Sequence, residues 1–124
     1  MPETPNFTLS EFACSCGCSE NRTKLGLLSA LQEVRDLFGR GIKIASGYRC
    51  EFHNKGVGGS PKSSHILGLA ADIAIPDSSY AFHLMKAIFE SHRFQRVGYG
   101  KMSGTLVLHV DIDLDKSQKV LWGY

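Results

Sequence analysis

The sequence predicts an α+β domain in which helices pack on one face of a small antiparallel sheet. Two segments carry apolar residues at three- and four-residue steps, the spacing of amphipathic helices, and about five shorter segments have the character of strands. A length of 124 residues suits a single domain, 1–124, with a small hydrophobic core. The sequence contains no internal repeat, linker or low-complexity tract that would divide it.

The two predicted helices have recognisable ends. The first begins near Thr23 as N-cap and ends at Gly39 or Gly41, and its apolar stripe contains Leu27, Leu28, Leu31, Val34, Leu37 and Phe38. The second begins at Asp77 or Ser78, and its stripe contains Ala81, Leu84, Met85, Ile88 and Phe89. Strands are expected at 42–45, 69–75, 96–100, 105–114 and 120–122, with an irregular segment at 1–20 and one helical turn near 51–55.

Composition and charge argue against several classes of protein. The net charge of +2 is too small to indicate a nucleic-acid partner, and no apolar run reaches the roughly 18 residues that a membrane helix needs. The first residues lack the basic and apolar regions of a secretory signal peptide. We therefore expect a monomer that is made in the cytoplasm without a signal peptide and does not insert into membranes.

The segment 105–114 carries the clearest chemical pattern. Side chains on a strand alternate between its two faces. One face is therefore apolar, with Leu106, Leu108, Val110, Ile112 and Leu114, and the other presents His109, Asp111 and Asp113. Such a polar face is either the hydrated side of a sheet or a functional site.

A second cluster lies upstream, where His65 sits in a Gly/Ser-rich loop and Asp72 on the strand that follows. Ala70 and Ala74, in phase with Asp72, leave room above its carboxylate. Taken singly, His65 could be an ordinary loop histidine, and Asp72 could cap a turn or pair with an arginine. Together with His109, they supply the two imidazoles and one carboxylate that a catalytic zinc site uses, with a fourth position left for water.

These residues stand in a longer motif. The pattern is Ser63-x-His65-x-x-Gly68-x-Ala70-x-Asp72, followed downstream by His109-Val110-Asp111 and preceded by Ser46-Gly-Tyr-Arg49, His53-Asn54 and Val57-Gly-Gly59. It resembles the zinc D-Ala-D-Ala carboxypeptidase and L-Ala-D-Glu endopeptidase family, of the lysostaphin, D-Ala-D-Ala peptidase and hedgehog superfamily. The opening segment from Phe7 to Phe12 is similar to that of short, phage- or prophage-type members.

The resemblance implies a hedgehog-like fold and a set of roles. His65, Asp72 and His109 would bind one catalytic zinc ion, Arg49 would hold a scissile carbonyl oxygen or a substrate carboxylate, and Ser63 would line the substrate cleft. The expected activity is hydrolysis of peptidoglycan stem peptides, as a carboxypeptidase or an endopeptidase, without a covalent intermediate. The enzyme would act on the cell wall, and a phage lysis enzyme released through the host membrane is one form of this hypothesis.

One departure from the family concerns the general base. Many relatives carry an acid or a histidine shortly before the last zinc ligand, whereas residues 103–108 contain neither. Asp111 is the candidate that remains, either as the base or as a partner that orients His109, and His53 and His92 are weaker candidates for the base. This gap supports one alternative, a non-catalytic zinc-containing binding module of the same fold. A third hypothesis is a structural domain in which zinc only joins loops, as small domains sometimes need.

Four cysteines form a further pattern, because Cys14, Cys16 and Cys18 lie one residue apart and Cys50 lies three residues before His53. They could bind a second, structural ion, although structural zinc sites usually have longer spacings. A disulfide between Cys50 and one of the other three is the alternative outside the cell. The third alternative is four free thiols.

Overall fold

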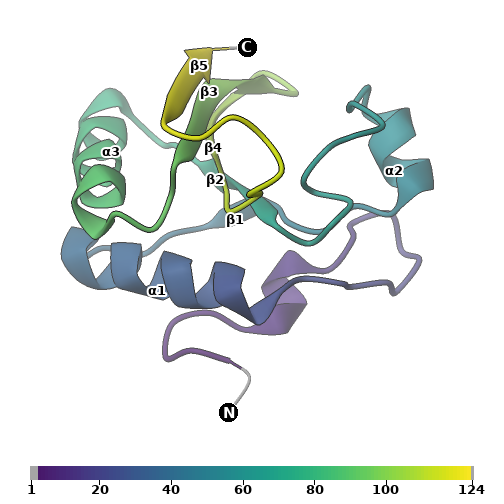
Figure 1. The fold of residues 1–124 in the computed structure, drawn as a ribbon, viewed down its shortest axis with the longest axis horizontal. Helices are drawn as coiled ribbons and strands as arrows, with labels where there is room; N and C mark the ends of the chain where they lie inside the picture. The colour runs from purple at the N-terminus through teal and green to yellow at the C-terminus, as the bar shows by residue number, and fades with distance from the viewer. Residues whose placement is uncertain (1–2, 124) are drawn as a thin grey trace.

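The computed structural model describes residues 3–123, and it has the predicted α+β architecture. A single five-stranded sheet has the order β1-β2-β4-β3-β5 (Figure 1). The strands are β1 Ile44–Ser46, β2 Ala70–Ala74, β3 Arg96–Met102, β4 Thr105–Asp111 and β5 Val120–Gly123. The helical elements are the short 3-10 helix η1 Leu9–Phe12 and the α-helices α1 Leu25–Phe38, α2 Glu51–Gly56 and α3 Ser78–Ser91.

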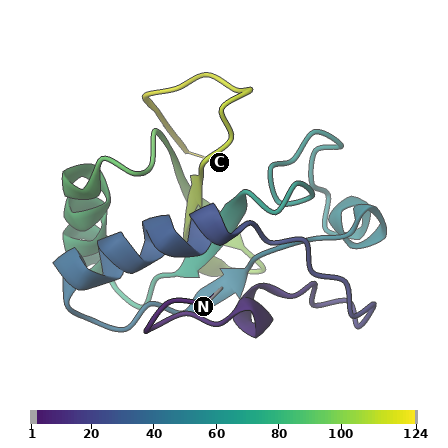
Figure 2. The ribbon, with the colours of Figure 1, turned by 60° about the horizontal axis from the view of Figure 1, so that its bottom comes forward.

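Helices α1 and α3 pack against each other and against the sheet through one hydrophobic core. Figures 1 and 2 show α1 and α3 on one side of the molecule and α2 on the other, with strands of the sheet between α3 and α2. The core takes alternate residues of the strands, such as Ile73, Leu108 and Val110. The residues between them, including Asp72 and His109, therefore lie on the other face, which the two long helices do not cover.

Several element ends differ from the sequence prediction. Helix α1 begins at Leu25 with Lys24 as N-cap, because the Thr23 hydroxyl instead donates a hydrogen bond to the Asn21 side chain. Strand β4 ends at Asp111, whose carboxylate accepts the backbone N–H of Asp113 and so turns the chain. Leu114, placed on the apolar face by its alternation, lies beyond this turn and is 83% exposed.

The sheet is mixed, because β5 runs parallel to β3 while the other pairs are antiparallel. The predicted edge strand at 120–122 is present as β5. Residues 112–119 lead from the end of β4 past β3 to the edge of the sheet, where β5 pairs with β3. Between β3 and β4 the turn residues Ser103 and Gly104 both have positive φ, at 51° and 81°, as a two-residue hairpin of type I′ requires. This turn fixes the register of the strand that carries His109.

Two glycines allow loops to approach the sheet closely. A Cβ on Gly47 would lie 2.6 Å from the Phe12 Cα, so only glycine lets the segment after β1 pack against η1. Gly68 has a φ of 73°, and a Cβ there would lie 2.0 Å from the backbone oxygen of Arg22. The loop that carries His65 is thereby held against the start of α1, where the Lys24 N–H donates to the Gly68 oxygen at 2.9 Å.

None of the helices in residues 3–123 combines the length and the apolar character needed to cross a membrane.

Candidate metal centre

A row of paired residues crosses all five strands on the face that the long helices leave open. Ser46 of β1 pairs with Asp72 of β2, which pairs with His109 of β4, followed by Gly98 of β3 and Trp122 of β5. Paired residues in neighbouring strands share a face of the sheet. The register therefore places the Asp72 carboxylate beside the His109 imidazole, although 36 residues separate them in the chain.

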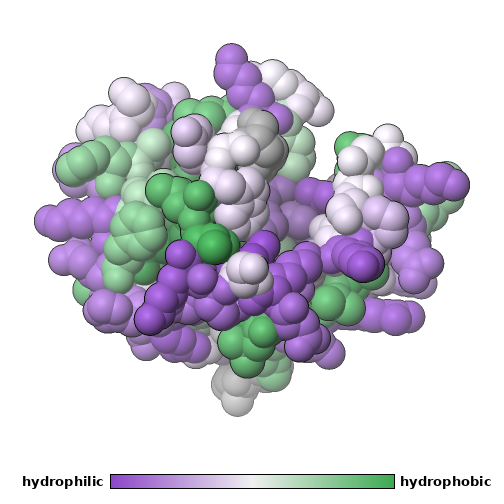
Figure 3. Space-filling model, turned by 45° about the horizontal axis from the view of Figure 1, so that its top comes forward, coloured by the Kyte–Doolittle hydropathy of each residue, from purple (hydrophilic) through white to green (hydrophobic). Residues whose placement is uncertain are grey.

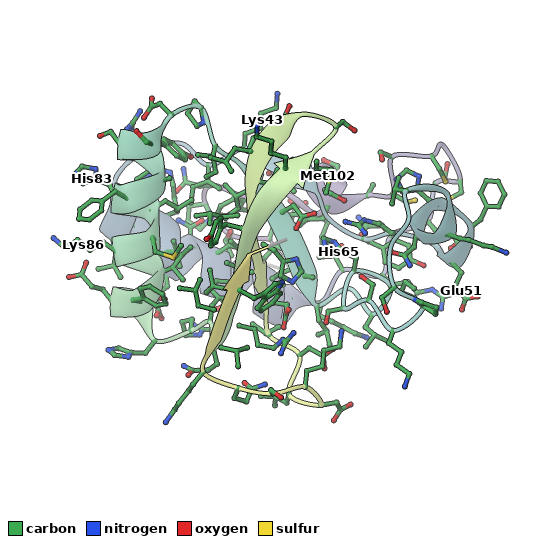
Figure 4. All side chains as sticks on the ribbon, turned by 90° about the horizontal axis from the view of Figure 1, so that it is seen from above. Lys43, Glu51, His65, His83, Lys86 and Met102 are labelled. Atoms are coloured by element: carbon green, nitrogen blue, oxygen red, sulfur yellow. The ribbon has the colours of Figure 1, made fainter. Side chains whose placement is uncertain are left out.

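His65 joins this pair from the loop before β2, and Figure 4 shows it between the sheet and the part of the chain that carries α2. Asp72 Oδ1 lies 3.3 Å from His65 Nε2 and 3.0 Å from His109 Nδ1. Ligand atoms of the three residues all lie within 4.8 Å of one another. The structure thus brings together the three predicted zinc ligands.

The hydrogen bonds of His65 fix its tautomer. Its Nδ1 lies 2.7 Å from the carbonyl oxygen of Gly47, and because a carbonyl only accepts, the proton is on Nδ1. The Nε2 lone pair then points to Asp72, and this atom is buried without a hydrogen-bond partner in residues 3–123. A buried polar atom without a partner is costly, so its position favours a cation as the missing partner.

His109 is arranged in the same way. Its Nε2 donates to Asp111 Oδ2 at 2.7 Å, which turns Nδ1 toward the Asp72 carboxylate. Burial lowers the pKa of His109, but hydrogen bonds and charge from Asp111 and Asp72 outweigh burial and raise it above its usual value. Two facing acceptor atoms need a positive charge between them, and either a proton on His109 or a metal ion provides it.

The donor set fits zinc. Bonds of about 2.0–2.1 Å to nitrogen and oxygen in a tetrahedron place neighbouring ligand atoms about 3.3 Å apart. The distances from Asp72 Oδ1 to His109 Nδ1, 3.0 Å, and to His65 Nε2, 3.3 Å, are close to this separation. Burial alone would raise the pKa of Asp72, but the adjacent His109 and His65 imidazoles hold it well below its usual range, so the carboxylate is charged.

Arg49 lies against the other oxygen of the same carboxylate. Its Nη2 donates to Asp72 Oδ2 at 3.1 Å, its Nη1 to Asn54 Oδ1 at 3.1 Å and its Nε to Ser46 Oγ at 3.2 Å. The side chain is buried, yet it lines the cleft described below. Arg49 therefore orients a predicted metal ligand, and its place at the cleft is compatible with the predicted contact to substrate.

Asp111 lies behind His109. One oxygen accepts from His109 and both lie near Arg96 Nε, at 2.9 and 3.2 Å, while the backbone N–H of Asp113 donates to Oδ1. Burial raises the pKa of Asp111, but the bond to His109 and the charges of His109 and Arg96 lower it below its usual value. Of the two roles left open for Asp111, these contacts favour orientation of His109 over proton transfer.

Replacing Asp111 by Asn should weaken zinc binding at this centre by about 10- to 100-fold, because an amide accepts the His109 N–H more weakly than a carboxylate. Zinc retained after dialysis against graded chelator concentrations measures the effect. Asp115→Asn, in the exposed part of the same loop, is the control and should leave zinc binding unchanged. Full zinc affinity together with lost cleavage in Asp111→Asn would instead support the role of Asp111 as base.

The other predicted residues fall into two groups. Ser63 and His53 line the cleft, and the Ser63 hydroxyl accepts the N–H of His65 at 3.2 Å. His53 Nε2 lies 3.1 Å from the Ser15 hydroxyl. His92 ends α3 in the left-handed conformation and lines a different pocket from the one above the three predicted ligands, which removes it as a candidate base.

A cleft of about 920 Å³ opens above the three predicted ligands. In Figure 3 the surface is hollowed between the lobe that carries α2 and the rest of the molecule. Trp122 lines this cleft, with its ring 5.5 Å from that of His109 and 4.9 Å from the Arg96 guanidinium. The sequence analysis missed Trp122, because only the register shows that Gly98 leaves space for the indole to reach His109.

The four cysteines also come together, at a second place in the structure. All four sulfur atoms, of Cys14, Cys16, Cys18 and Cys50, lie within 4.8 Å of one another. Cys14 and Cys50 are buried and the other two are exposed.

Comparison with protein families gives one result that bears on this centre. The sequence model of a family described as Peptidase M15 matches residues 5–111. The matched segment contains all three predicted zinc ligands, Arg49 and the four cysteines. No curated protein matches the chain.

Proposed function

Since the chain belongs to the peptidase M15 family, whose members are zinc-dependent peptidases, we propose that it hydrolyses a peptide bond in the stem peptides of bacterial peptidoglycan. The observation that carries the proposal is the convergence of His65, Asp72 and His109 on one point beneath an open cleft. The unpartnered Nε2 of His65 faces that point.

The ligand atoms for zinc would be His65 Nε2, Asp72 Oδ1 and His109 Nδ1. When bound, zinc supplies a Lewis acid that lowers the pKa of a coordinated water and polarises a carbonyl group. The hydrogen bonds to Gly47 and Asp111 hold both imidazoles in the tautomer that leaves these nitrogens free. The site is therefore organised before substrate arrives.

Arg49 has the geometry to stabilise negative charge on the substrate. A guanidinium carries five N–H donors in one plane, and three of them are used by Ser46, Asn54 and Asp72. The remaining donors are available to a carbonyl oxygen that becomes negative during hydrolysis, or to a substrate carboxylate. Both fit a stem peptide, whose D-residues carry free carboxylates.

The charges around the cleft also support an anionic substrate. Lys101 and Lys116 line it in addition to Arg49, and Lys101 is exposed. The net charge of +2 suits association with an anionic wall polymer. We propose accordingly that the protein works on the cell wall, after a phage-type release.

For the general base, His53 is the remaining cleft residue with a suitable side chain, since Asp111 is occupied by His109 and Arg96. The same observation supports a second candidate function. Without a free acid or base beside His109, the fold would serve as a zinc-containing module that binds stem peptides and does not cut them.

Incubation of the purified protein with muropeptides, followed by mass spectrometry, tests the proposal. We expect cleavage that stops when a chelator removes zinc and returns when zinc is restored. The mass of the released fragment then identifies the activity. A carboxypeptidase releases a terminal D-Ala, whereas an endopeptidase releases a larger piece. Zinc-dependent binding of muropeptides without cleavage would support the binding module, and neither binding nor cleavage would contradict both.

A further inference from the structure

The four sulfur atoms of Cys14, Cys16, Cys18 and Cys50, here called the cysteine cluster, have the spacing of a tetrahedral ligand set. The Sγ atoms of Cys14, Cys16 and Cys50 lie 3.4, 3.6 and 3.7 Å apart. Zinc–sulfur bonds of about 2.3 Å in a tetrahedron place neighbouring sulfurs about 3.8 Å apart. A disulfide would need sulfurs about 2.05 Å apart, so none of these four cysteines is bonded to another.

The backbone around the cysteine cluster favours the thiolate form that metals require. The N–H groups of Cys50, His53 and Glu20 donate to the sulfurs of Cys14, Cys50 and Cys18 respectively, each at 3.4 Å. Donors of this kind stabilise negative charge on sulfur. Three of the four sulfurs therefore already have a polar partner that suits an anion.

The one-residue spacing of the first three cysteines is explained by the turn between them. Gly17 and Ser19 have positive φ values of 88° and 64°, and the chain turns and bends over residues 15–18 instead of running extended. The three sulfurs consequently point to one side instead of alternating. Cys50, from a distant segment, completes the set and makes the site depend on the tertiary fold.

This part of the molecule has little hydrophobic core of its own. Residues 13–24 form no helix or strand, and Cys14, Tyr48 and Cys50 make a small buried cluster separate from the main core. Structural metals provide stability where a core is too small to do so. A metal here would replace the missing apolar contacts.

We propose that the cysteine cluster binds a second zinc ion, which fastens residues 13–20 to the segment that begins α2. Zinc binding would displace the thiol protons, and the ion would have four sulfur ligands and no open position, as in structural sites. The site lies next to the cleft wall, because Cys50 follows Arg49 and Ser15 contacts His53 at 3.1 Å. The second ion therefore fixes the wall that holds Arg49.

Zinc content per chain is the direct test, measured by elemental analysis of protein purified with zinc and a reducing agent. We expect two ions for the wild type and one for the Cys16→Ser/Cys18→Ser double variant, whose altered side chains are exposed. Ser15→Ala, in the same turn, is the matched control and should keep two. His109→Ala should also contain one ion, lost from the other site.

Cobalt substitution identifies which site is lost and does not depend on peptidase activity. Wild-type protein loaded with Co²⁺ should show an intense sulfur-to-cobalt charge-transfer band, which His109→Ala keeps and the double variant loses. The wild-type spectrum tests the inference even if the double variant fails to fold. One zinc per chain with no charge-transfer band, or a mass that reveals a disulfide in protein purified without reductant, would overturn it.

Discussion

Replacing His109 by Ala is expected to remove one zinc ion per chain and to lower peptidase activity by about 10³-fold or more. The imidazole would supply one of the three proposed protein ligands, and it lies at the centre of the row that crosses the sheet. Its loss also leaves the buried carboxylates Asp72 and Asp111 without their shared partner. Residual binding through His65 and Asp72 alone would be weak.

The measurement is zinc content together with the rate of muropeptide cleavage, and thermal unfolding shows whether the variant is folded. His83→Ala is the matched control, because His83 is exposed on α3, far from the cleft (Figure 4). It should keep both zinc and activity. Unchanged turnover in His109→Ala would show that the three-residue centre is not the catalytic site, whatever the cysteine cluster binds.

The elements that were predictable from the sequence are those with strong local patterns. Helix α3 begins after Asp77, whose carboxylate accepts the N–H of Tyr80, as its residue type indicated. Leu84 and Ile88 of the predicted stripe are fully buried. Local spacing is sufficient for such helices, because their apolar stripe and their cap lie within one continuous segment.

The features that the sequence did not predict, the direction of β5 and the end of β4, depend on contacts between distant segments. Nothing in residues 120–122 indicates that they pair in parallel with β3, because direction is set by the route of the preceding loop. The exposed position of Leu114 follows from the bond between Asp111 and the Asp113 backbone, which ends an alternation that the residue types alone would continue. Period-two patterns describe faces of a strand but not where the strand stops.

For the site, residue types and motif spacing predicted that His65, Asp72 and His109 come together, as they do in the structure, but they did not predict the surroundings of these residues. The orienting bond from His65 to Gly47 and the pairing of Arg96 with Asp111 both depend on sheet register and loop path. The role of Trp122 depends on the glycine beside it. Partners that hold a site in place are thus the part that only the fold reveals.

Replacing Arg49 by Lys should lower kcat/KM by about 10²- to 10³-fold while zinc content stays at the wild-type level. Lysine keeps the positive charge, but its single ammonium cannot contact Ser46, Asn54 and Asp72 at once and still present donors to the substrate. The substitution therefore keeps the positive charge and removes the planar arrangement of several N–H donors that a guanidinium provides.

Separate measurement of kcat, KM and zinc content assigns the role. If Arg49 stabilises the charge that develops on the carbonyl oxygen, kcat falls; if it binds a substrate carboxylate, KM rises. If it acts only by orienting Asp72, zinc affinity falls first and added zinc restores the rate. Arg93→Lys is the control, because Arg93 pairs with Glu33 at 3.1 Å outside the cleft. Wild-type kcat/KM in Arg49→Lys would remove Arg49 from the substrate site and leave it as support for the metal ligand.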